Sequence, residues 1–237
     1  MRPAPPPVDA SDPVTVQRYK AWQRTMHDQV RAYGDPDVAT VAGFDVQYGG
    51  QGEPAVAAAV VLSYPDSEIV DETVVSDRPG TPYRPGLLAL RELPLLLALA
   101  ETLETLPDVV FCDGHGVGHP RGFGLACHLG LALDLPVVGI AKNPPYRDGI
   151  PEPGPGRGDT ADIAPAADWD ECPAGPVIGR SVRTRDSTKP VYVSAGHKIS
   201  LDKSVELVLG TATRFRQPEP IRAADRLARA ERKKLSE

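Results

Sequence analysis

Three acidic residues lie within or directly after apolar stretches, where an unpaired carboxylate is costly. Asp45 interrupts a strand-like apolar run, Glu92 lies in a leucine-rich segment, and Asp113 directly follows the apolar residues 109–112. Each of these acids therefore needs a cation, a proton or a hydrogen-bond donor. A hard divalent cation such as Mg²⁺ would satisfy all three together. Metal-assisted cleavage of a phosphodiester uses such a cluster, because the metal orients a water molecule and neutralises the leaving oxygen.

Each acid taken alone could instead cap a helix or pair with a neighbouring side chain. The three together favour a site, because acids clustered inside apolar elements are typical of functional centres.

The segment that follows the third acid has the composition of an anion-binding loop. Residues 114–124 contain five glycines, beginning with Gly114, and the polar side chains of His119 and Arg121. Glycines let the backbone approach a ligand closely, and the N-terminus of the helix expected beyond them would favour an anion. Arg121 could bind a phosphate through two N–H groups. We interpret the segment as a phosphate or nucleotide cradle; the alternative is a tight turn with surface histidines.

Three further residues have types that suit contact with a nucleic acid. Lys142 follows an apolar strand-like run and could meet a phosphate as a point charge, or simply be exposed. Tyr83 lies in a proline-stiffened turn, where an aromatic ring could enter a base stack or pack on the surface. Asp225, in a basic C-terminal segment, could be a fourth metal ligand or the i,i+4 partner of Arg229.

The bulk composition indicates an ordinary globular protein. The chain has 237 residues, 41% hydrophobic and 24% charged, with a formal net charge of −6. The acidic total argues against non-specific coating of nucleic acid, although basic residues could still share one face. Three cysteines without metal-ligand spacing indicate free thiols. The absence of a membrane-length apolar run and of a signal-peptide pattern leads us to expect a cytoplasmic protein with no membrane contact.

The elements that must position these residues can be read from the hydrophobic periodicity. We expect helices over 14–33, 86–106 (with a kink or restart at Pro94), 122–134 and 204–209 and from Pro218, and strands over 38–48, 55–64, 68–76, 109–113, 136–141, 177–184 and 191–194. Short links make the first three strands an antiparallel meander, and strand 109–113, its helix and strand 136–141 form a βαβ unit.

The predicted fold class is α/β, with a mixed sheet of meander and parallel strands flanked by helices. Neighbouring strands lie about 4.8 Å apart, so Asp45 and Asp113 on adjacent strands could share one ion. We expect residues 1–13 to be a disordered lead and 14–237 a single catalytic domain. A Pro-, Gly- and Asp-rich stretch at about 144–176 is expected to be an irregular insertion.

Taken together, the motifs resemble the endonuclease V family of deoxyinosine 3′ endonucleases, which have a ribonuclease H-like fold. The resemblance is carried by Gly43–Val46, by Tyr83–Gly86 through Arg91 and Glu92, by Asp113–Gly124, by Gly139–Lys142, and by Lys189–His197.

The resemblance implies a role for each candidate residue. Asp45, Glu92 and Asp113 would be catalytic acids that bind the metal, with Asp225 at the fourth ligand position. Lys142 would contact the phosphate or the leaving group. The remaining residues would bind the substrate: Tyr83 as a wedge beside Arg84, and Gly86, Leu88, Gly114 and Gly139 as walls of a hypoxanthine pocket near His119 and Arg121.

The resemblance also implies a reaction and its partners. The second phosphodiester bond 3′ to deoxyinosine would be hydrolysed with Mg²⁺ or Mn²⁺, leaving 3′-hydroxyl and 5′-phosphate ends, after the base is flipped out. The partner would be DNA with deoxyinosine or another deaminated base, and we expect a monomer. Three alternatives stay open: an endoribonuclease for inosine-containing RNA, a non-catalytic nucleic-acid-binding module, and a small-molecule phosphatase.

Overall fold

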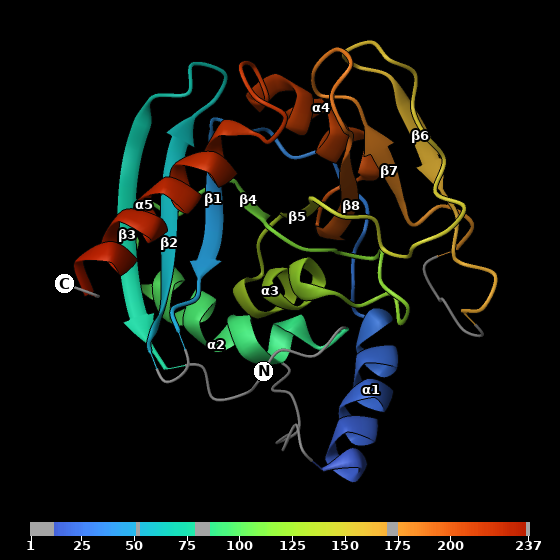
Figure 1. The fold of residues 1–237 in the computed structure, drawn as a ribbon, viewed down its shortest axis with the longest axis horizontal. Helices are drawn as coiled ribbons and strands as arrows, with labels where there is room; N and C mark the ends of the chain where they lie inside the picture. The colour runs from blue at the N-terminus through green and yellow to red at the C-terminus, as the bar shows by residue number, and fades with distance from the viewer. Residues whose placement is uncertain (1–11, 51–52, 79–85, 170–174, 236–237) are drawn as a thin grey trace.

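The protein is built around one eight-stranded mixed sheet within the part of the chain that the structure describes (Figure 1). The structure is a computed structural model that describes residues 12–50, 53–78, 86–169 and 175–235. The strand order is β3-β2-β1-β4-β5-β8-β7-β6. The strands are β1 (Thr40–Gln47), β2 (Ala55–Ser63), β3 (Ile69–Asp77), β4 (Val109–Cys112), β5 (Val137–Ala141), β6 (Thr160–Ile163), β7 (Gly179–Val182) and β8 (Val191–His197).

Helices cover both faces of this sheet. They are α1 (Pro13–His27), α2 (Leu88–Glu101), α3 (Leu125–Leu133), α4 (Leu201–Thr211) and α5 (Glu219–Leu235). One face packs α2 and α3 against alternate residues of β1, β2 and β4. The other face packs α4 and the start of α5, and Figure 1 shows α5 crossing in front of β1 and β2. Strands buried on both sides read as continuous apolar runs, which explains the sequence of β2.

Close contact between α5 and the sheet depends on small residues. In β2, Ala58 packs against Ala228 of α5. In β1, a Cβ added to Gly43 would lie 2.0 Å from the carbonyl oxygen of Pro220. Because no side chain separates the two backbones there, the first turn of α5 is seated directly on β1.

Most of the predicted order of elements is confirmed. The first three strands form the antiparallel meander, β4 and β5 pair in parallel, and β1 pairs in parallel with β4. Asp12 caps α1 by accepting hydrogen bonds from two backbone N–H groups. Cys112 and Cys127 are buried free thiols; the third cysteine lies outside the described residues.

Three details differ from the expectations. Helix α1 ends at His27 rather than Tyr33. Pro94 lies inside one continuous helix, so of the two alternatives expected there, a kink or a restart, the restart does not occur. The stretch 144–176 is not wholly irregular, because it contributes β6, which pairs with β7 at the sheet edge. Among the helices of the described ranges, none has the length and apolar character needed to cross a membrane.

Candidate active site

The fold brings the three predicted acids to the walls of one small cavity. Phe44 of β1 lies opposite Cys112 of β4 in the parallel register, and Asp45 and Asp113 each follow by one residue. Glu92 approaches from α2, and the three carboxylates line a cavity of about 60 Å³. The structure thus brings these three acids, far apart in sequence, to one cavity.

Each carboxylate accepts a hydrogen bond from a protein donor. Lys142 Nζ lies 2.5 Å from Asp113 Oδ2. Gln47 Nε2 donates to Asp45 Oδ2 at 2.7 Å. The Tyr48 hydroxyl donates to Glu92 Oε1 at 2.9 Å. The acids therefore have local partners: Gln47 and Tyr48 lie at the end of β1, and Lys142 directly follows β5.

These hydrogen bonds do not remove the free-energy cost of holding the three carboxylates close together in the charged form. Burial raises the pKa of Asp45 to about 6, opposed by the Gln47 hydrogen bond and reinforced by the charge on Asp113. Burial likewise raises the pKa of Glu92 to about 8, opposed by the Tyr48 hydrogen bond and reinforced by the charges of Asp45 and Asp113. The cavity therefore disfavours negative charge unless a cation enters it.

The donor set suits a hard divalent cation, because carboxylate oxygens are the ligands such ions prefer. As arranged here, no three His, Cys, Asp or Glu side chains within the described ranges have the spacing to hold an ion. Lys142, Gln47 and Tyr48 each donate to one oxygen of these carboxylates, and a bound cation would compete with them for those oxygens.

Asp225 is linked to this cluster through one side chain. Gln47 Nε2 lies 2.9 Å from Asp225 Oδ1 as well as 2.7 Å from Asp45. Asp225 Oδ2 also accepts from Arg229 Nε at 2.8 Å. The helix pairing predicted for Asp225 is therefore present, and the same residue is connected to Asp45 in a way that leaves the ligand role open.

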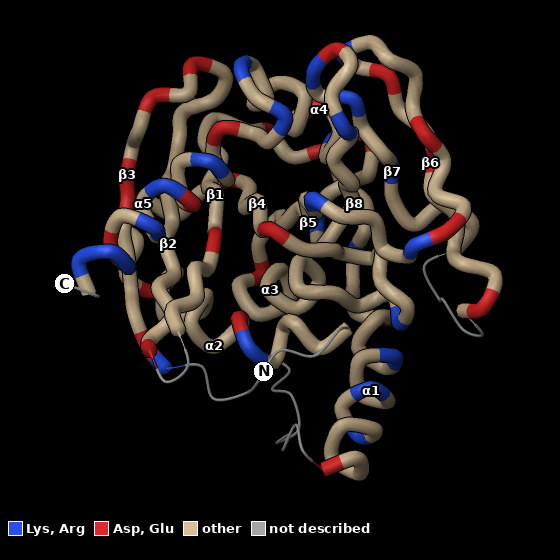
Figure 2. Tube along the Cα trace, in the orientation of Figure 1, with Lys and Arg blue, Asp and Glu red and all other residues tan. Residues whose placement is uncertain are grey.

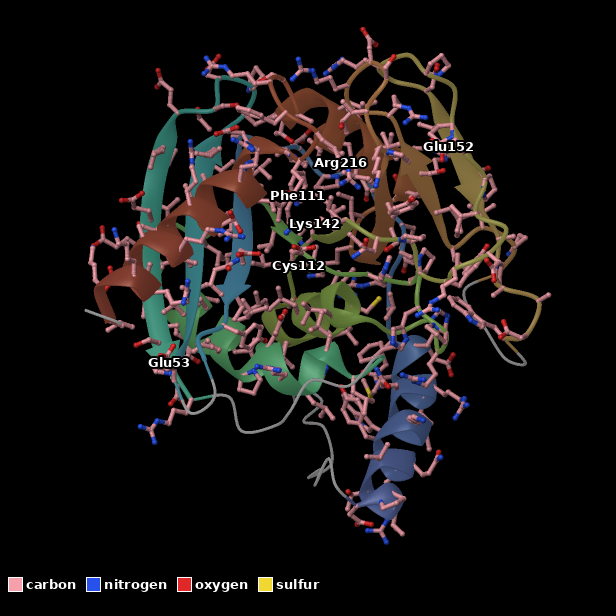
Figure 3. The ribbon with its side chains drawn as sticks, in the orientation of Figure 1. Glu53, Phe111, Cys112, Lys142, Glu152 and Arg216 are labelled. Atoms are coloured by element: carbon pink, nitrogen blue, oxygen red, sulfur yellow. The ribbon has the colours of Figure 1, made fainter. Side chains whose placement is uncertain are left out.

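Lys142 is fixed as a cation beside Asp113. Burial alone would lower its pKa, but the charge and hydrogen bond of Asp113 outweigh burial, so the pKa of Lys142 is raised. Its main-chain oxygen accepts from Arg216 Nη2 at 2.8 Å, and both residues are labelled in Figure 3. A lysine held in the charged form can offset negative charge but cannot act as a base.

A second cavity lies against the glycine-rich loop. It measures about 130 Å³ and is lined by three of the residues predicted to form a base pocket, Gly86, Leu88 and Gly114, together with His119. Gly139 is not among its lining residues. A Cβ at Gly139 would come within 2.6 Å of the Gly116 backbone nitrogen, so this glycine supports the loop from behind.

The predicted cradle residues His119 and Arg121 are both largely buried. His119 Nδ1 accepts from the Arg121 backbone N–H at 3.3 Å, which leaves Nε2–H to donate to the Gly86 carbonyl at 3.2 Å. Burial, reinforced by the Arg121 charge, lowers the pKa of His119 to about 3. His119 is therefore a neutral donor at neutral pH.

Gln23 of α1 is a pocket residue that sequence reasoning missed. Its Oε1 accepts from Arg121 Nε at 2.7 Å, its Nε2 donates to the Phe123 carbonyl at 2.9 Å, and Arg121 Nη2 reaches the Gly86 carbonyl at 2.6 Å. The available signal was its position: Gln23 is four residues after Tyr19, on the apolar face of the helix. A polar residue on such a face needs buried partners.

The two remaining predicted residues, Tyr83 and Arg84, lie outside the described residues. The next described residue is Gly86, whose φ of +74° suits glycine. The wedge prediction for that turn stays a prediction.

The amino-acid sequence is similar to that of known proteins over most of its length. The sequence profile of endonuclease V matches residues 23–226. Endonuclease V from Nocardia farcinica is 43% identical over 220 residues, covering 92% of this chain and 93% of that protein. Endonuclease V from Gloeobacter violaceus is also 43% identical, over 93% of this chain and 87% of that protein.

Solved structures share this fold over nearly the whole chain. Endonuclease V from Streptomyces avermitilis superposes with a TM-score of 0.85 at 37% identity, covering 97% of this chain and 98% of that one. Ciona intestinalis endonuclease V, solved with a 24mer DNA containing an inosine followed by a ribo-adenosine, gives a TM-score of 0.76 at 32% identity, with 93% and 98% coverage. The sheet and its helices thus have the predicted ribonuclease H-like arrangement, and the chain belongs to the endonuclease V family.

Proposed function

We propose that the protein is a divalent-metal-dependent endonuclease that hydrolyses the second phosphodiester bond 3′ to deoxyinosine in DNA. The products would carry 3′-hydroxyl and 5′-phosphate ends. Membership of the endonuclease V family makes the chain a nuclease, and the Ciona relative was solved with inosine-containing DNA. Deoxyinosine is deaminated deoxyadenosine, so the activity would serve DNA repair.

The observation that carries this proposal is that the acid cavity and the glycine-walled cavity adjoin. Asp113 lines the first, the next residue Gly114 lines the second, and Leu125 lines both. A base held in the glycine-walled cavity would therefore keep its own strand beside the carboxylates. Gly86 and Gly114 line this cavity without a side chain, so their backbone can come close to the edge of a flipped base.

Asp45, Glu92 and Asp113 would hold Mg²⁺ or Mn²⁺, with Asp225 as a fourth candidate ligand. When bound, such a cation supplies an oriented, activated water and neutralises charge on the leaving oxygen. The protein's own residues contribute in other ways. Lys142 holds Asp113 and offers a positive charge to the phosphate, and Gln47 keeps Asp45 and Asp225 together.

The test is cleavage of an end-labelled duplex with a single deoxyinosine, with Mg²⁺ or with EDTA, by wild type and Asp113→Asn. We expect a metal-dependent nick one nucleotide beyond the lesion by wild type and none by the variant. Asparagine keeps the shape of the side chain, so matched thermal melting would show that the loss is chemical. Absence of any nick by wild type with either metal would refute the proposal.

The same assay with inosine-containing RNA separates the alternative substrate. Cleavage of RNA without cleavage of DNA would support the proposed active site but show that its substrate is RNA. Binding without cleavage of either would leave a nucleic-acid-binding module, and hydrolysis of simple phosphate monoesters alone would indicate a phosphatase.

A further inference from the structure

A large groove runs past the active site and carries an excess of positive charge. It measures about 930 Å³, about seven times the glycine-walled cavity. Its charged lining residues are the cations Lys20, Arg121, Lys142 and Arg147 and the single acid Asp113. That acid is already paired with Lys142. In a chain of net charge −6, such a local excess favours a polyanion.

The groove is too large to serve the extruded base alone, and part of its lining comes from the start of the stretch predicted as an insertion. Residues 143–147 line it, including Pro144, Pro145, Tyr146 and Arg147. The two consecutive prolines restrict the backbone and remove two N–H donors. The wall that these residues form begins directly after Lys142, so it adjoins the candidate active site.

Two later residues of the insertion, Ala164 and Trp169, brace the aromatic ring of Tyr146. The Tyr146 hydroxyl donates to the Ala164 carbonyl at 2.7 Å. The ring of Trp169 meets the Tyr146 ring edge-on, with centroids 5.4 Å apart at an interplanar angle of 81°. Tyr146 is therefore fixed at its hydroxyl and against Trp169, and it lines the groove beside Arg147.

A fixed aromatic ring beside a cation is the combination that binds a nucleic-acid strand without reading its sequence, by stacking and by phosphate contact. Figure 2 shows that α1, which supplies Lys20 to the groove lining, also carries Lys and Arg along its turns. We infer that residues 143–147, braced by Ala164 and Trp169, form a second strand-binding wall. In it, Tyr146 stacks on a nucleotide flanking the extruded base and Arg147 contacts a backbone phosphate. This inference rests on the proposed function for the identity of the strand.

The experiment measures binding of a fluorescent duplex with one deoxyinosine by anisotropy, in EDTA and over a range of salt concentrations, so that no cleavage is involved. The variants are Tyr146→Leu, Tyr146→Phe and Arg147→Gln. Arg185→Gln is the matched control, because Arg185 is exposed and lies outside the groove lining. Thermal melting establishes that each variant is folded.

We expect Tyr146→Leu to weaken binding by at least about fivefold, because a stacked base is lost. Tyr146→Phe keeps the ring and should bind within about twofold of wild type. Arg147→Gln should reduce the slope of log K against log salt concentration by about one, the signature of one lost phosphate contact. Arg185→Gln should keep the wild-type slope.

Wild-type affinity in folded Tyr146→Leu, or a wild-type salt slope in Arg147→Gln, would overturn the inference. Nicking by wild type separates this failure from failure of the proposed function. If wild type nicks deoxyinosine DNA while the variants bind unchanged, only the second wall is refuted. If wild type does not nick but the variants lose affinity as expected, the second strand-binding wall is supported and the proposed reaction is refuted.

Discussion

Replacing Gly43 with alanine tests whether α5 is seated on β1 at backbone distance. The added Cβ would lie 2.0 Å from the Pro220 carbonyl oxygen and 2.5 Å from the Ile221 backbone nitrogen. Such carbons essentially never approach backbone atoms below 3.0 Å, so the first turn of α5 must move by about 1 Å. Overpacking of this kind costs about 1–3 kcal/mol, a substantial share of a typical folding free energy of roughly 5–15 kcal/mol.

The same displacement should reach the active site. If Asp225 moves with its helix, its 2.9 Å contact with Gln47 lengthens to about 3.9 Å, beyond hydrogen-bond range. Urea denaturation followed by circular dichroism gives the change in unfolding free energy at constant m value, and nicking of deoxyinosine DNA gives the effect on activity, which we expect to fall. Gly50→Ala is the control, because its new Cβ would meet only the Glu53 side chain at 3.5 Å; it should stay within about 0.5 kcal/mol of wild type. Equal stability of Gly43→Ala and Gly50→Ala would refute this account of the seating of α5.

Three further predictions follow from the site and its surroundings. Lys142→Met should lower the nicking rate by about 10²-fold or more, because in the proposed reaction Lys142 offers its positive charge to the reacting phosphate. Metal-free duplex affinity should change less than tenfold, and Lys142→Arg should recover part of the lost rate. A wild-type rate in Lys142→Met would contradict this. Gln23→Met leaves Arg121 Nε without its acceptor, so urea denaturation should show a loss of about 1–3 kcal/mol of unfolding free energy, and the KM for deoxyinosine DNA should rise. Gln23→Glu keeps an acceptor and should lose less unfolding free energy. Equal losses in the two variants would count against the contact. Burial lowers the pKa of His128 to about 3 from 6.5, so the unfolded chain takes up the proton first as the pH falls. Between about pH 6.5 and 3 this histidine should remove roughly 1.4 kcal/mol of stability per pH unit, and His128→Phe should lessen the measured slope by that amount; an unchanged slope would show that the ring is not buried in the neutral form.

The parts of the fold that sequence predicted are those governed by local pattern. A meander and a βαβ unit are predicted without knowledge of which strands pair. The signals are the alternation of β3, the apolar runs of β2 and β4, and the turn residues between the strands. The acids could be selected for the same reason, because Asp45 and Asp113 each stand at the end of an apolar strand segment.

The parts that sequence did not predict depend on contacts between distant residues. Strand β6 has only four residues, of which Ile163 alone is buried, and it is a strand because it pairs with β7. The contact between Gln23 and Arg121 joins residues 98 positions apart. Neither periodicity nor composition records such a pairing.

The assembly of the acid cavity from distant segments bears on when activity appears during folding. Thr40 and Asp108, at the start of the parallel contact between β1 and β4, are 68 residues apart along the chain, and Asp225 arrives only with the last helix. Closing such long loops is slow compared with local contacts, so meander and helices can form while the carboxylates are still apart. A nascent or partly folded chain would then be unable to cut nucleic acid, and nicking in a refolding reaction would first appear only after β1 has paired with β4.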